Sequence, residues 1–201
     1  MENDLYKTIK APAQGELFKD KNSKFYGFAF PVTHEDQVKA HLEAIKKEHY
    51  AARHWCYAYQ IGTETLNYRA NDDGEPNNSA GMPIYGQLQS FEVTNTLIIV
   101  VRYYGGVKLG VGGLINAYRT SAQLTLEACE IIERTINSSF QLQFEYKNMS
   151  KVMRILKEND VQITNQILEL DCLLEISVRK NHSEKIFELF SHFFGVEIKS
   201  L

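Results

Sequence analysis

Hydrophobic positions change their period several times along this chain, and each period predicts a different element. Strands are predicted where β-branched and aromatic residues alternate with polar ones or form short apolar runs. In the first two thirds of the chain these strands are residues 6–9, 16–18, 24–32, 54–61, 65–70 and 94–103. Apolar residues three or four positions apart predict helices over 33–50 and 83–91, and a third that follows a glycine-rich loop and ends near Ile132.

The last third of the chain predicts a regular succession of elements. Strands are expected at 140–146, 161–168, 170–178 and 196–199, and helices around 149–156 and over 182–194. The order β-α-β-β-α-β is that of the ferredoxin-like split βαβ unit. We therefore predict an α+β protein with two domains, residues 1–135 and 136–201, and we place the boundary between them at 133–139.

Composition and charge narrow the range of partners. The chain has 22 Lys and Arg against 25 Asp and Glu, so its net charge of −3 argues against nucleic-acid binding driven by overall charge and leaves a local basic patch open. The three scattered cysteines, Cys56, Cys129 and Cys172, are typical of reduced thiols in a cytosolic protein. No secretory signal is visible, and the longest apolar run, 97–101, is too short for a bilayer. We expect a cytoplasmic protein with no membrane partner.

The strongest chemical signal is the run from Val100 to Leu114, in which five glycines and one lysine lie between a strand and a helix. Glycine lets the backbone approach a ligand closely, and a helix start offers free N–H groups and a positive dipole end. The run therefore predicts an anion site in which Lys108 and the loop amides hold phosphate and Arg102 supports them. The candidate ligand-binding residues are Arg102, Gly105, Gly106, Lys108, Gly110, Gly112 and Gly113.

The same run has a plainer interpretation. Glycines also serve tight turns and close packing of a helix on a strand, without any ligand. The spacing is not that of GxxxxGK[ST], which disfavours a P-loop nucleotide hydrolase.

A polar loop over 71–81 supplies the candidates for catalysis. Asp72, Asp73 and Glu75 are the type of ligand that Mg²⁺ prefers, and such an ion near the glycine loop would suit phosphoryl transfer or phosphoester hydrolysis. The alternative is a solvated turn, because Asp, Gly and Pro are common in turns for steric reasons.

Two further pairs of residues have a chemical and a structural interpretation. His54 and Cys56 lie two apart on one strand and face the same way, which suits a Cys–His nucleophile, but a buried thiol beside a hydrogen-bonded histidine is the favoured interpretation. One of Tyr103 and Tyr104 must face away from the core, where it would offer a platform for stacking a base; core packing with a satisfied hydroxyl is the alternative.

Three segments together resemble a known family. They are RHWCYAY at 53–59, NDDGEP at 71–76 with SAGMP at 79–83, and VRYYGGVKLGVGGL at 101–114. Their order and spacing are similar to the IMPACT/YigZ family, and the tail after about Asn137 is similar to the small C-terminal domain of its bacterial members. The chain departs from the family pattern at two places near the site. Asn78-Ser79 stands where many members have a small residue followed by Thr. Asn116 stands where many members have a basic residue before Ala-Tyr, and Arg119 is a poorer match for that basic residue on the same helix face.

The resemblance implies a fold and a cellular context. It implies an N-terminal domain similar to domain 2 of ribosomal protein S5 and a ferredoxin-like C-terminal domain similar to the last domain of the translocating elongation factor. Both point toward translation. Eukaryotic members restrain an initiation-factor kinase through an additional N-terminal domain, so that role is not expected here. Bacterial members have been suggested to bind nucleic acid, and the resemblance implies no established reaction.

These observations predict a translation-associated regulatory protein, which binds RNA, the ribosome or another phosphate-bearing ligand through residues 105–113 and needs no cofactor. The alternative is a metal-dependent phosphotransferase or phosphoester hydrolase that uses the acidic residues 72–75. A protein–protein adaptor without an anion site is the third hypothesis. The expected partners are RNA or the translation machinery, with a protein partner left open.

Overall fold

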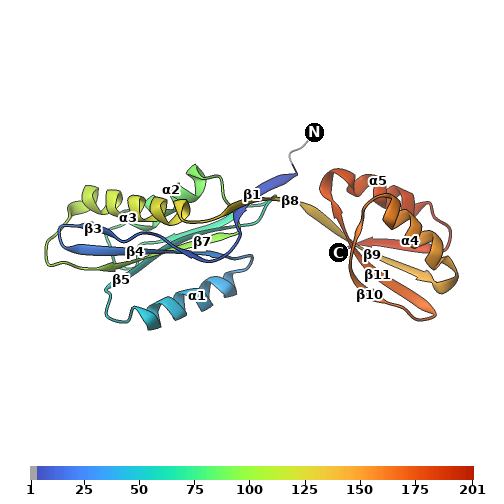
Figure 1. Cartoon of the computed structure of the whole chain (residues 1–201), viewed down its shortest axis with the longest axis horizontal. Coiled ribbons are helices and arrows are strands. Elements are labelled where there is room, and N and C mark those ends of the chain that lie inside the picture. Colours follow the sequence, from blue (N-terminus) through green and yellow to red (C-terminus); the bar gives the residue numbers. More distant parts are fainter. Residues whose placement is uncertain (1–3) are drawn as a thin grey trace. The chain divides into compact units, whose positions relative to one another are not determined.

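A computed structural model describes residues 4–201 and divides into two compact units. The larger unit comprises residues 6–134, and the smaller comprises 135–201 together with residues 4 and 5. Each unit contains a β-sheet covered by helices, so the chain has the mixed α/β character that its sequence predicts (Figure 1). Within residues 4–201, no helix combines the length and the apolarity needed to cross a membrane.

The larger unit is built around an antiparallel sheet with the strand order β2-β4-β7-β5-β6, in which β3 also pairs with β4. Strand β1 pairs with β8 outside this sheet. Helix α1 covers one face of the sheet, and α2 and α3 cover the other (Figure 1). The elements are β1 (Leu5–Ile9), β2 (Ala13–Gln14), β3 (Phe18–Asp20), β4 (Ser23–Pro31), α1 (Glu35–Glu48), β5 (His54–Ile61), β6 (Asn67–Asn71), α2 (Gly81–Ser90), β7 (Thr96–Tyr103), α3 (Gly110–Glu127) and β8 (Ile131–Thr135).

The central strand β7 is apolar at almost every position because helices cover both of its faces. Ile98 and Val100 pack in the core under α2 and α3, while Leu97, Ile99 and Val101 pack in the core under α1. Successive side chains of a strand alternate between faces. The next residue on the side of α2 and α3 is therefore Arg102, which places a buried guanidinium near the start of α3.

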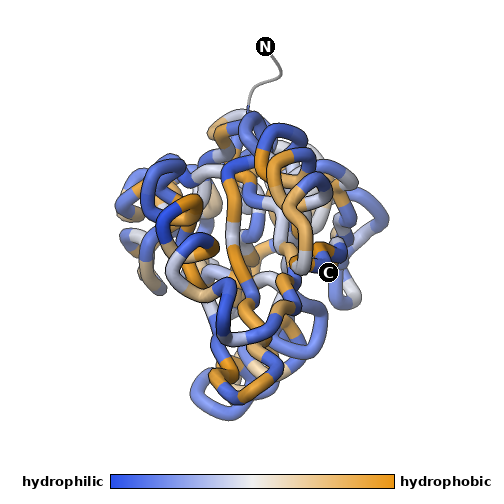
Figure 2. Tube along the Cα trace, turned by 90° about the vertical axis from the view of Figure 1, so that its right-hand side faces the viewer, coloured by the Kyte–Doolittle hydropathy of each residue, from blue (hydrophilic) through white to orange (hydrophobic). Residues whose placement is uncertain are grey.

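The smaller unit has one antiparallel sheet in the order β10-β11-β9-β12. Its elements are β9 (Asn137–Glu145), a 3₁₀ turn (Tyr146–Asn148), α4 (Met149–Glu158), β10 (Gln162–Ile167), β11 (Asp171–Arg179), α5 (Lys180–Ser191) and β12 (Val196–Ser200). Leu142, Leu174 and Ile176 from the sheet form a core with Val152 of α4 and Phe190 of α5. In Figure 2 hydrophobic and hydrophilic stretches alternate along the trace, as expected for strands with one buried face.

The main differences from the predicted elements concern α3. This helix begins within the glycine run at Gly110 rather than at Leu114, and it ends at Glu127 rather than near Ile132. Because glycine has a low helix propensity, the sequence pattern around residues 110–113 predicts a loop where the structure has the first turn of α3. Strand β8 occupies 131–135, where the end of a helix and the start of a domain boundary are predicted. All six elements predicted for the last third are present, in the predicted order.

Candidate functional site

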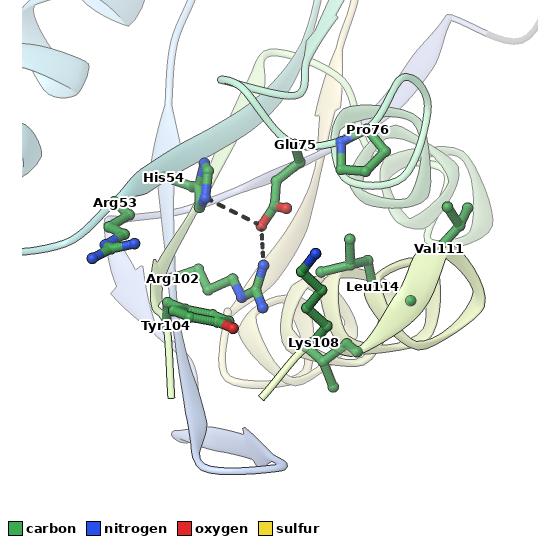
Figure 3. A pocket seen from close by; sticks show the side chains of 11 residues that line it. Arg53, His54, Glu75, Pro76, Arg102, Tyr104, Lys108, Val111 and Leu114 are labelled. Carbon is green, nitrogen blue, oxygen red and sulfur yellow. Dashed lines mark hydrogen bonds and ion pairs between the residues drawn. The ribbon is translucent and has the colours of Figure 1, made fainter. Parts of the chain in front are cut away.

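A cavity of about 510 Å³ opens at the N-terminal end of α3, entirely within the larger unit. Its walls come from the start of β5, the loop before α2, the end of β7 and the glycine run (Figure 3). The lining residues are Arg53, His54, Glu75, Pro76, Arg102, Tyr104, Lys108, Leu109, Gly110, Val111 and Leu114. The cavity thus brings together both segments that the sequence singled out, and its volume lies in the range typical of small-molecule sites.

A buried ion pair forms one wall of the cavity. Arg102 Nη1 donates to Glu75 Oε1 over 2.6 Å, and the two side chains are 5% and 4% exposed. The hydroxyl of Tyr118 on α3 donates to the same oxygen over 2.8 Å. Arg102 Nη2 lies 3.4 Å from Ser23 Oγ, whereas its buried Nε has no hydrogen-bond partner within the described chain. The predicted supporting cation is therefore held by protein groups.

His54 lies beside this ion pair at the start of β5. Its Nδ1 is 2.9 Å from the carbonyl oxygen of Asp73, and because that oxygen can only accept, Nδ1 carries the hydrogen. In the neutral ring Nε2 is then an acceptor, and it lies 3.9 Å from Glu75 Oε1. His54 is half-buried and lines the cavity, so Nε2 is available to a ligand.

Cationic side chains form the rim. Lys108 is exposed and, within residues 4–201, makes no ion pair; its amino end points toward the Arg102–Glu75 pair (Figure 3). The guanidinium groups of Arg53 and Arg102 lie 5.7 and 5.3 Å from the centre of the Tyr104 ring, at cation–π distance. The residues that line the cavity thus include three cations and one carboxylate, a positive balance that the net charge of the chain does not reveal.

The glycines of the run differ in what their surroundings require. Gly105 permits a close approach, because a Cβ there would lie 2.1 Å from the backbone carbon of Asn22. Gly106 and Gly110 have φ of +87° and +74°, a region that favours glycine. At Gly112 a Cβ would meet nothing within 4 Å, and at Gly113 it would approach Leu109 to 3.1 Å. Packing thus explains Gly105, whereas Gly112 has open space beside it.

The amide groups at the start of α3 are the predicted anion donors. The N-cap residue is Leu109, and within the described chain no side chain caps this helix. The first N–H groups of an α-helix have no acceptor inside the helix. Gly105 is different, since its amide already donates to Ser23 Oγ over 3.2 Å. The donors available to a ligand are therefore those of the first turn of α3 and not the whole run.

The three acidic residues of the loop do not converge on a common point. Asp72 Oδ1 accepts from the amides of Ala80 and Gly81 at 2.9 and 2.8 Å, so this carboxylate caps α2. Asp73 Oδ2 accepts from the amide of Trp55 at 2.7 Å, and Glu75 pairs with Arg102. Across residues 4–201, the structure contains no cluster of three His, Cys, Asp or Glu side chains suited to a metal ion. The three carboxylates predicted for Mg²⁺ therefore each accept from donors of the chain itself, and the solvated turn is wrong for Glu75, which is buried.

Cys56 is the buried thiol that the sequence favoured. Its Sγ donates to the carbonyl of Asp72 at 3.0 Å and lies 3.3 Å from Tyr118 Oη. Burial raises the pKa values of both Cys56 and Tyr118 above their ordinary range. These two groups stay protonated and hold the floor of the site together, so neither is a nucleophile at neutral pH.

Sequence reasoning missed the role of Tyr118 and of Arg53. Tyr118 packs in the core on the inward face of α3, and a signal that could have found it is its hydroxyl on an otherwise largely apolar helix face. Arg53 belongs to the first of the three family segments but was given no role. Arg119, considered as a replacement for a missing basic residue, is exposed and does not line the cavity. The hydroxyl of Tyr103 forms a hydrogen bond with His49 Nδ1 over 3.0 Å, whereas Tyr104 is the exposed tyrosine of the two.

Comparison with known proteins identifies the family to which the chain belongs. Residues 21–126 match the family model described as the Impact N-terminal domain. The chain is also 35% identical over 154 residues to the IMPACT family member YvyE of Bacillus subtilis (strain 168), an alignment that covers 77% of this chain and 70% of the relative. The chain belongs to the IMPACT family.

Other relatives extend the match beyond the site. An IMPACT family member of Haemophilus influenzae (strain ATCC 51907 / DSM 11121 / KW20 / Rd) is 33% identical over 187 residues, covering 90% of this chain and 87% of the relative. A crystal structure described as that of a hypothetical protein aligns with a TM-score of 0.74 and 27% identity over 98% of both chains. The family resemblance found in the sequence is confirmed, and the matched IMPACT domain contains every residue that lines the cavity.

Proposed function

We propose that this IMPACT family protein is a cytoplasmic, translation-associated regulator that binds RNA, free or within the ribosome, through phosphate at the start of α3. Membership of the IMPACT family supports the translation context. The observation that carries the proposal is that Lys108 lines the cavity beside a helix start that no side chain caps, while Arg53 lines the opposite side (Figure 3). Cations and free amides that meet at one cavity are suited to a phosphate group.

The folds of the two units are part of this proposal. We propose that the larger unit has the fold of ribosomal protein S5 domain 2 and that the smaller unit is ferredoxin-like, with the domains at 1–135 and 136–201. The sheet order β10-β11-β9-β12 supports the second assignment, because the two central strands are the first and third of the unit. Fold likeness alone does not assign a function, so the binding proposal depends on the cavity.

The experiment measures binding of the full chain to a fluorescein-labelled single-stranded RNA by anisotropy, over a series of salt concentrations. We expect Lys108→Ala to weaken binding about 3- to 10-fold and to reduce the slope of log affinity against log salt by about one phosphate contact. Lys47→Ala is the matched control, since Lys47 is an exposed lysine of the same unit on α1, away from the cavity.

Three outcomes would count against the proposal. They are no measurable RNA binding, binding that does not depend on salt, and an equal effect of Lys108→Ala and Lys47→Ala. Any of these outcomes would favour the hypothesis of a protein–protein adaptor, in which the cavity contacts a protein and not phosphate.

A further inference from the structure

The two carboxylate oxygens of Glu75 have different environments. Oε1 accepts two hydrogen bonds, from Arg102 and from Tyr118. Oε2 has no hydrogen-bond partner within residues 4–201, although the side chain is only 4% exposed and lines the cavity. In Figure 3 this second oxygen points away from the contacts with Arg102 and His54. Oε2 is thus an acceptor that is open to the cavity, and it suits a ligand that supplies a hydrogen-bond donor.

The groups around Glu75 restrict that ligand further. In the neutral ring, whose Nδ1 donates to Asp73, His54 Nε2 is a second acceptor on the same wall. Val111 and Leu114 contribute apolar surface, and Lys108 contributes a cation on the opposite side of Glu75 from His54 (Figure 3). A matching ligand has an anion, an apolar planar body and a hydrogen-bond donor attached to that body. A nucleotide whose base carries an amino group has all three.

We propose that Glu75 selects a nucleotide with an amino-bearing base, such as cytosine or adenine, over one with uracil. This inference rests on the proposed function, which places the phosphate at Lys108 and the start of α3. The amino group donates to Glu75 Oε2, whereas uracil presents a carbonyl oxygen at the corresponding position. That oxygen faces a carboxylate with no proton between them, so uracil binds more weakly than cytosine or adenine.

The substitution Glu75→Gln distinguishes a specificity role from a structural one. The amide oxygen of glutamine must take the place of Oε1, because Arg102 and Tyr118 both donate to that position. The amide NH₂ then faces the cavity, which turns an acceptor into a donor. The preference for an amino-bearing base over uracil should therefore invert. The glutamine NH₂ would donate to the uracil carbonyl oxygen, and it would meet the amino group of cytosine or adenine as donor against donor. A residue that only supports the fold would weaken both nucleotides equally.

The experiment uses isothermal titration of the full chain with cytidine, uridine and adenosine 5′-monophosphates and with ribose 5-phosphate. For the natural protein we expect the cytidine nucleotide to bind about tenfold more tightly than the uridine nucleotide, with the adenosine nucleotide similar to cytidine. In Glu75→Gln we expect this ratio to fall below one. Glu43→Gln, the same change at an exposed position on α1, is the control and should leave the ratio unchanged.

The outcomes distinguish failure of base selection by Glu75 from failure of the proposed phosphate site. If neither the nucleotides nor ribose 5-phosphate bind, the phosphate site and the base selection both fail. If all four ligands bind equally, the phosphate site stands and the role of Glu75 is wrong. If cytidine is preferred but Glu75→Gln keeps that preference, another group selects the base. Thermal unfolding of each variant confirms that the ratios are measured on folded protein.

Discussion

Arg102 and Glu75 form an ion pair inside the larger unit, with 2.6 Å between Nη1 and Oε1. The pair joins the end of the central strand β7 to the loop that precedes α2. Tyr118 adds a hydrogen bond from α3 to the same carboxylate. One contact point therefore connects strand, loop and helix, and two of the three groups, Arg102 and Glu75, line the cavity.

Removing one member of this pair should destabilise the protein strongly. Arg102→Ala leaves Glu75 buried with an uncompensated charge, and breaking such a pair typically costs about 3–5 kcal/mol in the free energy of unfolding. Urea unfolding followed by circular dichroism measures the loss. The double variant Arg102→Met with Glu75→Leu should recover most of it, because two apolar side chains need no partner. Equal instability of the single and double variants would contradict this account.

The glycines of the run should respond differently to alanine. Gly105→Ala should cost several kcal/mol or prevent folding, because its Cβ would overlap the backbone of Asn22. Gly112→Ala meets open space in the first turn of α3 and should raise the free energy of unfolding by up to about 1 kcal/mol, the propensity difference between the two residues. Thermal melts of both variants test this contrast. A destabilising Gly112→Ala would indicate a contact at that position that the structure lacks.

The carboxylate of Asp72 should behave as a helix cap and not as a metal ligand. Its Oδ1 and Oδ2 accept three backbone amides, from Asn78, Ala80 and Gly81, so Asp72→Ala should lower the free energy of unfolding by about 1–2 kcal/mol. Millimolar Mg²⁺ should leave the melting temperature of the natural protein unchanged, since a ligand that binds the folded state would raise it. A rise that Asp72→Ala abolishes would restore the metal hypothesis.

Stability should fall as the pH rises above about 9. Burial raises the pKa of Cys129 from 9.0 to about 11, and burial also raises the pKa of Cys56. Between pH 9 and 11 the unfolded thiols release protons that the folded protein retains, so the free energy of unfolding decreases with pH. Urea titrations at pH 8, 9, 10 and 11 measure this slope. Cys129→Ala should make it shallower, and a slope of the opposite sign would show that the thiol is not buried.

Much of the architecture was predictable because the relevant patterns are local. The alternation in β5 and the continuous apolar run in β7 identify both strands, and all six elements of the last third follow from their periods. The first turn of α3 was not predictable in this way. Glycines at 110, 112 and 113 oppose a helix by propensity, and packing of Leu114 and Tyr118 in the core under α3 overrides that preference.

The candidate site was predictable only in part. The glycine run and Lys108 indicated an anion site; Lys108 and Gly110 line the cavity, whereas Gly105, Gly106, Gly112 and Gly113 do not. The acidic loop was misjudged because three neighbouring carboxylates look alike in a sequence. In the structure Asp72 caps a helix, Asp73 accepts from Trp55, and Glu75 pairs with Arg102. Which acceptor meets which donor depends on segments far apart in the chain.

The sequence by itself determined most of the strands and helices, the family motifs and the residue types available for an anion site, because each depends on neighbours along the chain. Only the tertiary structure decided that Glu75 lies buried between Arg102, Tyr118 and His54, with hydrogen bonds from the described chain to only one of its two oxygens. The reason is that a buried charge must be satisfied by whatever donors the packing brings to it, and no local period encodes that choice.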